Sequence, residues 1–234
     1  METVEFLVCP DMHGRDFWRP LLQYEGNIVC LGDYTDPYPA EGFTQEDCLN
    51  NLQELIDFKK ANSERVTLII GNHDFHYFSL IYAAARFSAQ HYKQFKALFV
   101  ENKELFQIAK QIGNYFFTHA GVIFDWYYEQ KRYFEVLGDT LEEQLNAAFY
   151  EKRHIYNEMS FYRGGKMWMS GSPIWADKNE IVNCKPLGID IIQVVGHNRF
   201  PHERTQPIKC GKYIFTDNQK LWLFKDGEIT EFTG

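Results

Sequence analysis

The chain has 234 residues, of which 45% are hydrophobic and 24% are charged, as is ordinary for a globular protein with a sizeable core. Its formal net charge of −8 argues against a general nucleic-acid-binding surface, which usually needs a basic face. The five cysteines form no CxxC pair, which predicts a protein without disulfides. The chain has no basic signal segment and no apolar run near the ~20 residues of a membrane span, so we expect it to be cytoplasmic.

Short apolar runs recur in the first third of the chain. They lie at residues 6–9, 27–31 and 66–70. Each is too short for a helix and stops at a proline or glycine, which is typical of strands buried on both faces. A helix is predicted from about Glu46 to Lys60, where Thr44 and Asp47 resemble a capping box. The resulting rhythm predicts parallel strands joined by right-handed crossovers.

Helical patterns rich in aromatic residues follow, at about 75–112 and about 125–160. We expect these rings to pack a helical layer on a sheet, with the lining of a substrate cleft as the alternative for some of them. Further strands are predicted at residues 115–118 and 191–195. No linker or repeat divides the chain, so a single domain over 1–234 is expected, with the two helical segments as insertions.

The tail is predicted to be antiparallel from residue 213 onward. Its last two apolar runs flank Asp226-Gly227, and Asp-Gly between alternating runs is a good hairpin signal.

Each of the five predicted strands ends in polar residues. They are Asp11, His13, Asp33, Asp36, Asn72, His73, His119 and His197. Because ligands of open α/β sheets bind beyond the carboxyl ends of strands, we expect these side chains to converge at one sheet edge. Carboxylate, imidazole and amide oxygen ligands suit Mn²⁺, Fe²⁺ or Zn²⁺. Two such ions ~3.5–4 Å apart can clamp a phosphoryl group and activate water for in-line attack.

Five motifs in this order resemble the signature of the calcineurin-like metallophosphoesterases. They are Asp11-x-His13, Gly32-Asp33-x-x-Asp36, Gly71-Asn72-His73-Asp74, His119-Ala120-Gly121 and Gly196-His197. The resemblance spans about residues 5–220. It implies an α/β fold, a four-layer α/β/β/α sandwich with mixed sheets, in which a dimetal site lies at the C-terminal ends of the strands.

The resemblance also implies a role for each motif residue. Two divalent metal ions (Mn, Fe or Zn) would be held by Asp11 and His13 at the first position, by Asn72, His119 and His197 at the second, and by Asp33 as the bridge. His73 would be the general acid and Asp36 would hold its imidazole, since a paired carboxylate keeps the charged imidazole accessible near neutral pH. Asp74 is expected to stabilise the loop.

Within the superfamily, the chain most resembles the phosphoprotein phosphatase branch and the bacterial diadenosine tetraphosphatases. One position departs from the pattern of the phosphatase branch. That branch has an arginine that grips the substrate phosphate where this chain has Pro37. Arg163, ahead of a Gly-Gly loop, and Arg199, two residues after His197, are the candidate replacements. We favour Arg163, because a surface salt bridge is at least as good an account of Arg199.

The leading prediction is a dimetal-dependent, serine/threonine phosphatase-like hydrolase of phosphomonoesters or phosphoanhydrides. Its substrate would be a phosphorylated small molecule, a nucleotide or a phosphoprotein, without a membrane partner. The alternatives are a dinucleoside polyphosphate hydrolase, a phosphodiesterase and a non-catalytic binding module on the same fold. The phosphodiesterase is disfavoured because the nucleases of the superfamily carry a second histidine at the position of Arg199. The sequence leaves the oligomeric state open.

Overall fold

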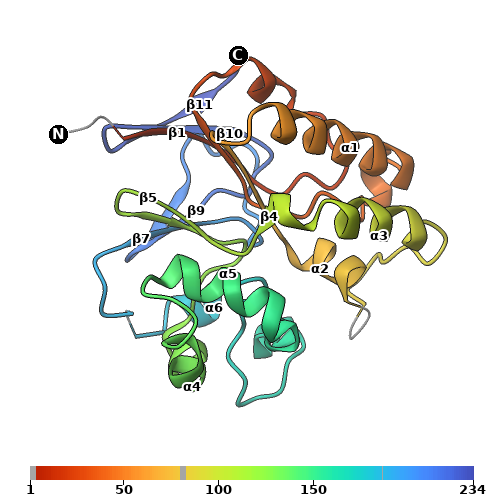
Figure 1. Ribbon diagram of the computed structural model, residues 1–234. Coiled ribbons are helices and arrows are strands. Elements are labelled where there is room, and N and C mark those ends of the chain that lie inside the picture. Colours follow the sequence, from red (N-terminus) through yellow and green to blue (C-terminus); the bar gives the residue numbers. More distant parts are fainter. Residues whose placement is uncertain (1–3, 80–82, 186) are drawn as a thin grey trace.

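The computed structural model describes residues 4–79, 83–185 and 187–234, and contains two mixed β-sheets (Figure 1). The first has the order β11 (Glu228–Phe232), β10 (Leu221–Lys225), β1 (Glu5–Cys9), β2 (Asn27–Cys30), β3 (Val66–Ile69) and β4 (Phe106–Gln107). The second has the order β5 (Lys110–Ile112), β6 (Tyr115–Phe117), β7 (Ile192–Val195), β9 (Tyr213–Phe215) and β8 (Ile208–Cys210).

The central strands of each sheet are parallel. In the first sheet β1, β2, β3 and β4 run in one direction, β10 is antiparallel to β1, and β11 is antiparallel to β10. In the second sheet β6, β7 and β9 are parallel, with β5 and β8 antiparallel at the edges. Parallel neighbours place their carboxyl ends at the same edge, which is where the predicted ligand residues follow.

Helices cover the outer faces of the two sheets (Figure 1). The side of the first sheet carries α1 (Gln45–Ala61), α2 (Asn72–Phe78) and α3 (Tyr92–Glu101). The side of the second carries α4 (Phe124–Phe134), α5 (Leu141–Glu151) and α6 (Lys178–Ile181). The predicted α/β architecture with mixed sheets is confirmed. The capping box of Thr44 and Asp47 also forms at the start of α1.

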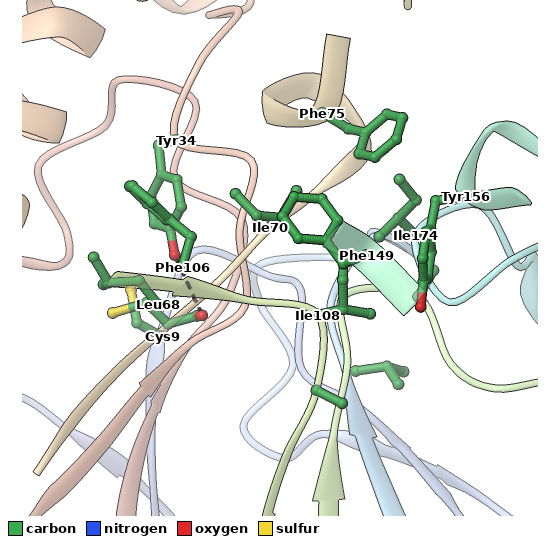
Figure 2. Close-up of a cluster of buried hydrophobic side chains, with 14 of the residues drawn as sticks. Cys9, Tyr34, Leu68, Ile70, Phe75, Phe106, Ile108, Phe149, Tyr156 and Ile174 are labelled. Carbon is green, nitrogen blue, oxygen red and sulfur yellow. Dashed lines mark hydrogen bonds between the residues drawn. The ribbon is translucent and has the colours of Figure 1, made fainter. Parts of the chain in front are cut away.

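Two buried clusters hold these layers together. Between the sheets, Phe6 of β1 meets Phe117 of β6 with ring centroids 5.0 Å apart. Beneath the helices, Phe75, Phe149 and Tyr156 gather over Ile70 and strand residues (Figure 2). Most aromatic residues of the helical segments are buried in this way, as expected, because their large apolar surface stabilises the helix–sheet contact.

Two predictions of secondary structure are wrong. The helical segment of 75–112, of which 80–82 lie outside the described residues, ends at α3. Its last part forms β4 and β5, because Phe106 pairs with Leu68 and Lys110 with Phe117 across strands far away in the sequence. The tail is not wholly antiparallel, since β9 pairs in parallel with β7 before the chain crosses to the other sheet.

Two smaller expectations concern the cysteines and the membrane. All five cysteines are free thiols, and Cys9 and Cys30 are buried partners on β1 and β2. Across the described residues, no helix has both the length and the apolar character that crossing a bilayer requires.

Candidate active site

The predicted ligand residues meet where the edges of the two sheets come together. Asp11, Asp33 and Asn72 follow β1, β2 and β3 of the first sheet, whereas His119 and His197 follow β6 and β7 of the second. The expectation of a single sheet edge is therefore wrong, because β6 and β7 pair with each other and not with β3. The backbone N–H of His197 donates to Asp11 Oδ1 at 3.0 Å and ties the two edges together.

The ligand atoms form two overlapping groups. One consists of Asp11, His13 and Asp33, and the other of Asp33, His119 and His197. Within each group the candidate oxygen and nitrogen atoms lie within 4.8 Å of one another. Asp33 belongs to both, so its carboxylate stands between two positions for a cation.

Hydrogen bonds fix which ring nitrogen faces the centre. His13 Nδ1 lies 2.8 Å from the carbonyl oxygen of Thr35, and His119 Nδ1 lies 2.8 Å from that of Leu31. A neutral imidazole that donates from Nδ1 presents a bare Nε2, and such second contacts orient histidine ligands of metals. The Nε2 atoms of these two histidines lie 3.4 Å and 3.5 Å from Asp33 Oδ2.

The donor set fits divalent cations. His119 Nε2 lies 3.0 Å from Asn72 Oδ1 and 3.1 Å from His197 Nδ1, so lone pairs converge on one point. Burial, with repulsion from Asp11, raises the pKa of Asp33 well above its ordinary value. Burial, with Arg163 nearby, lowers the pKa of His197. Cations relieve both penalties, because they favour an ionised carboxylate and a neutral imidazole.

The close approach of these residues requires glycine and strained backbone. A Cβ on Gly71 would overlap the Asp33 carboxylate, and one on Gly196 would overlap Asp11 Oδ1. Left-handed φ angles occur at the site residues His13 (49°), Asp33 (53°), Asp36 (57°) and His197 (59°). Residues other than glycine adopt this conformation at a cost, and such strain is concentrated at functional sites.

His73 begins a second, hydrogen-bonded group at the start of α2. Its Nδ1 lies 2.9 Å from Asp36 Oδ2, and the Tyr77 hydroxyl donates to Asp36 Oδ1 at 2.7 Å. His76 Nε2 lies 3.0 Å from Asp36 as well. Burial alone would raise the pKa of Asp36, but His73 and His76 outweigh it and lower the pKa. Asp36 is therefore an ionised anchor for the His73 ring.

Asp74 stabilises the loops beneath the site. Its carboxylate accepts hydrogen bonds from the backbone N–H groups of Asp33 (2.7 Å), Tyr34 (2.9 Å) and Gly71 (3.0 Å). It thereby joins the end of β2 to the end of β3, and it belongs to neither ligand group.

A cavity of about 270 Å³ opens over the ligand residues, and two arginines line it. Arg163 does so from the short helix η5 (Phe161–Arg163), with its Nε 2.7 Å from Asp177 Oδ2. Arg199 is not among the lining residues; it is 45% exposed and pairs with Glu41 at 3.1 Å.

The second lining arginine, Arg86, is one that sequence reasoning missed. Its Nε donates to the Asp36 carbonyl oxygen at 2.9 Å, and its Nη2 lies 3.3 Å from His73 Nε2. The guanidinium lies over the Tyr38 ring, 3.7 Å from the centroid. No motif surrounds Arg86, so only the path of the chain after α2 brings it to the site.

Comparison with known proteins agrees with this geometry. The family description "Calcineurin-like phosphoesterase" matches residues 4–201. Among solved structures, the chain is similar to a point mutant of a cold-active protein tyrosine phosphatase (TM-score 0.62, 16% identity, 97% of this chain and 77% of that chain). It is also similar to the cold-active protein-tyrosine phosphatase of a psychrophilic Shewanella species (TM-score 0.58, 17% identity, 97% and 77%). At these identities the likeness shows the fold alone. No curated protein sequence matches the chain.

Gly196→Ala tests the close approach at Asp11. The added Cβ displaces the Asp11 carboxylate, so we expect Mn²⁺ affinity, measured by calorimetry, to fall by about 10-fold to 100-fold. Gly211→Ala is the control, because its added Cβ meets no atom within 4 Å, and its positive φ (57°) strains the backbone only away from the site. Equal Mn²⁺ affinity in the two variants would contradict the assignment.

Proposed function

Because this chain belongs to the calcineurin-like phosphoesterase family and is a phosphoester hydrolase, we propose that it hydrolyses phosphomonoesters with two divalent metal ions. The observation that carries the proposal is the position of Asp33, whose carboxylate belongs to both ligand groups. Asp11 and His13 would complete the first metal position. Asn72, His119 and His197 would complete the second metal position. When bound, the ions would supply Lewis-acid activation of water and neutralise charge on the phosphoryl group.

His73 is suited to be the general acid. Its Nδ1 contacts Asp36, so Nε2 is the atom directed at the cavity. Burial lowers the pKa of His73 overall, contrary to the expectation from its paired carboxylate, and Asp36 only partly opposes that shift. The protonated ring would donate from Nε2 to the leaving oxygen, with the Asp36 carboxylate stabilising the imidazolium. Tyr77 and His76 position Asp36 and act on the reaction only through it.

Arg86 and Arg163 are suited to hold the phosphate. A phosphomonoester carries about −1.5 to −2 charges near neutral pH, and guanidinium groups bind its oxygens in a bidentate manner. The two arginines line the cavity from different elements, Arg86 beside His73 and Arg163 beside His197. Arg86 would then supply the phosphate-binding guanidinium that the related phosphatases carry at the position of Pro37.

Metal removal is the direct test of the reaction class. We expect chelation to abolish hydrolysis of p-nitrophenyl phosphate and Mn²⁺ to restore it, with the diester bis-p-nitrophenyl phosphate a much poorer substrate. Full activity after verified removal of metal would contradict the dimetal proposal. Preferential cleavage of the diester would instead favour a phosphodiesterase.

His73→Asn separates acid catalysis from metal binding. Phenyl phosphate has a poor leaving group and needs the proton, so we expect about a 100-fold to 1000-fold loss of kcat on it. The loss should be much smaller on p-nitrophenyl phosphate, whose leaving group is stable without a proton, and metal content should be unchanged. An equal loss of kcat on both substrates would exclude a general-acid role for His73.

Lysine substitutions compare the three arginines. Arg86→Lys and Arg163→Lys keep the charge but lose the planar fork, so each should reduce kcat/KM for p-nitrophenyl phosphate by about tenfold. Arg199→Lys is the matched control and should retain activity, because Arg199 does not line the cavity. A loss in Arg199→Lys as large as in the other two variants would refute this assignment.

A further inference from the structure

A second cavity, of about 330 Å³, lies next along the chain to the cavity over the ligand residues. The short helix η5 contributes lining residues to both cavities. Arg163, its last residue, lines the first cavity, whereas Phe161 and Tyr162 line the second. A molecule whose phosphate is held by Arg163 therefore has the second cavity on the other side of the same helical turn.

The ion pair of Arg163 with Asp177 joins helix η5 to the start of α6. Asp177 is followed by α6, whose residues Asn179 and Glu180 line the second cavity. The Glu180 carboxylate accepts a hydrogen bond from the backbone N–H of Gly171 at 3.0 Å, which closes the loop that begins at η5. The wall shared by the cavities is thus held by hydrogen bonds at both ends of this loop.

Helix η5 and the loop after it present large apolar side chains to solvent. Those exposed by more than half are Phe161 (53%), Tyr162 (54%), Met167 (78%) and Trp168 (76%). All four line the second cavity. Single exposed apolar residues are ordinary on a protein surface, but a group of this size around a cavity marks a binding surface. Aromatic residues and methionine are also enriched at protein interfaces.

The second cavity is acidic, whereas aspartates and arginines both line the first. Asp125 and Glu180 line it, and none of its lining residues within the described part of the chain is a lysine or arginine. A chain of further phosphates would be repelled there, whereas a basic side chain would be attracted. The exposed apolar side chains come from both η5 and the loop after it, which favours an extended ligand such as a polypeptide.

From these observations we propose that the second cavity and the exposed residues of 161–168 bind the peptide part of a phosphoprotein substrate. A lysine or arginine near the phosphorylated residue would face Asp125 and Glu180, and a neighbouring apolar side chain would pack on Trp168. This inference rests on the proposed phosphomonoesterase function, and it names the substrate class of that site.

Trp168→Ala and Asp125→Asn test the inference in the whole 234-residue chain. The probe is a short fluorescent phosphoserine peptide with flanking arginine and leucine, and a second peptide carries glutamate in place of arginine. We expect the wild type to bind the basic peptide more tightly in fluorescence anisotropy. Each substitution should weaken that binding by about fivefold, the scale of one screened ion pair or one partly buried aromatic contact.

Two controls separate this inference from the proposed function. Val136→Ala removes an equally exposed apolar residue (78%) that does not line the cavity, and it should leave peptide binding unchanged. All three variants should hydrolyse p-nitrophenyl phosphate as the wild type does. Unchanged peptide binding in Trp168→Ala and Asp125→Asn would overturn the inference alone. A metal-loaded wild type that binds the basic peptide but hydrolyses no phosphomonoester would overturn the proposed function instead.

Discussion

The buried carboxylate of Asp33 is the group on which the rest of the site depends. Its Oδ1 accepts the backbone N–H of His73 at 2.9 Å, while its Oδ2 faces histidines from both sheets. Gly71 makes room for it, and Asp74 holds its backbone N–H. A second carboxylate, Asp11, lies near and raises its pKa further. Placing these anions together is unfavourable without cations, so folding of this region and metal binding are coupled.

The separation of roles along α2 follows from the same geometry. Asn72 and His73 are adjacent in the sequence, yet Asn72 turns its amide oxygen toward His119 and His73 turns its ring toward Asp36. Successive residues of a helix point about 100° apart, so neighbours at its first turn reach different partners. One strand end can therefore supply both a ligand atom and a candidate proton donor.

Much of this site could be predicted from the sequence, because each ligand residue follows a short apolar run and most lie beside a glycine. The capping box at Thr44 was equally local. Features set by tertiary pairing were not predictable: Phe106 joins β3 although its surroundings have a helical pattern, and β9 joins β7 in parallel. Arg86 reaches His73 through a loop with a left-handed φ of 66° at Arg86 itself, which no spacing rule indicates.

The most direct test of the central claim is the number and separation of metal ions in the Mn²⁺-loaded protein. Electron paramagnetic resonance combined with metal analysis would measure both. A carboxylate shared by two ligand groups predicts two ions per chain, magnetically coupled and about 3.5–4 Å apart, with the coupling lost in Asp33→Asn. One ion per chain, or two uncoupled ions in the wild type, would contradict the account.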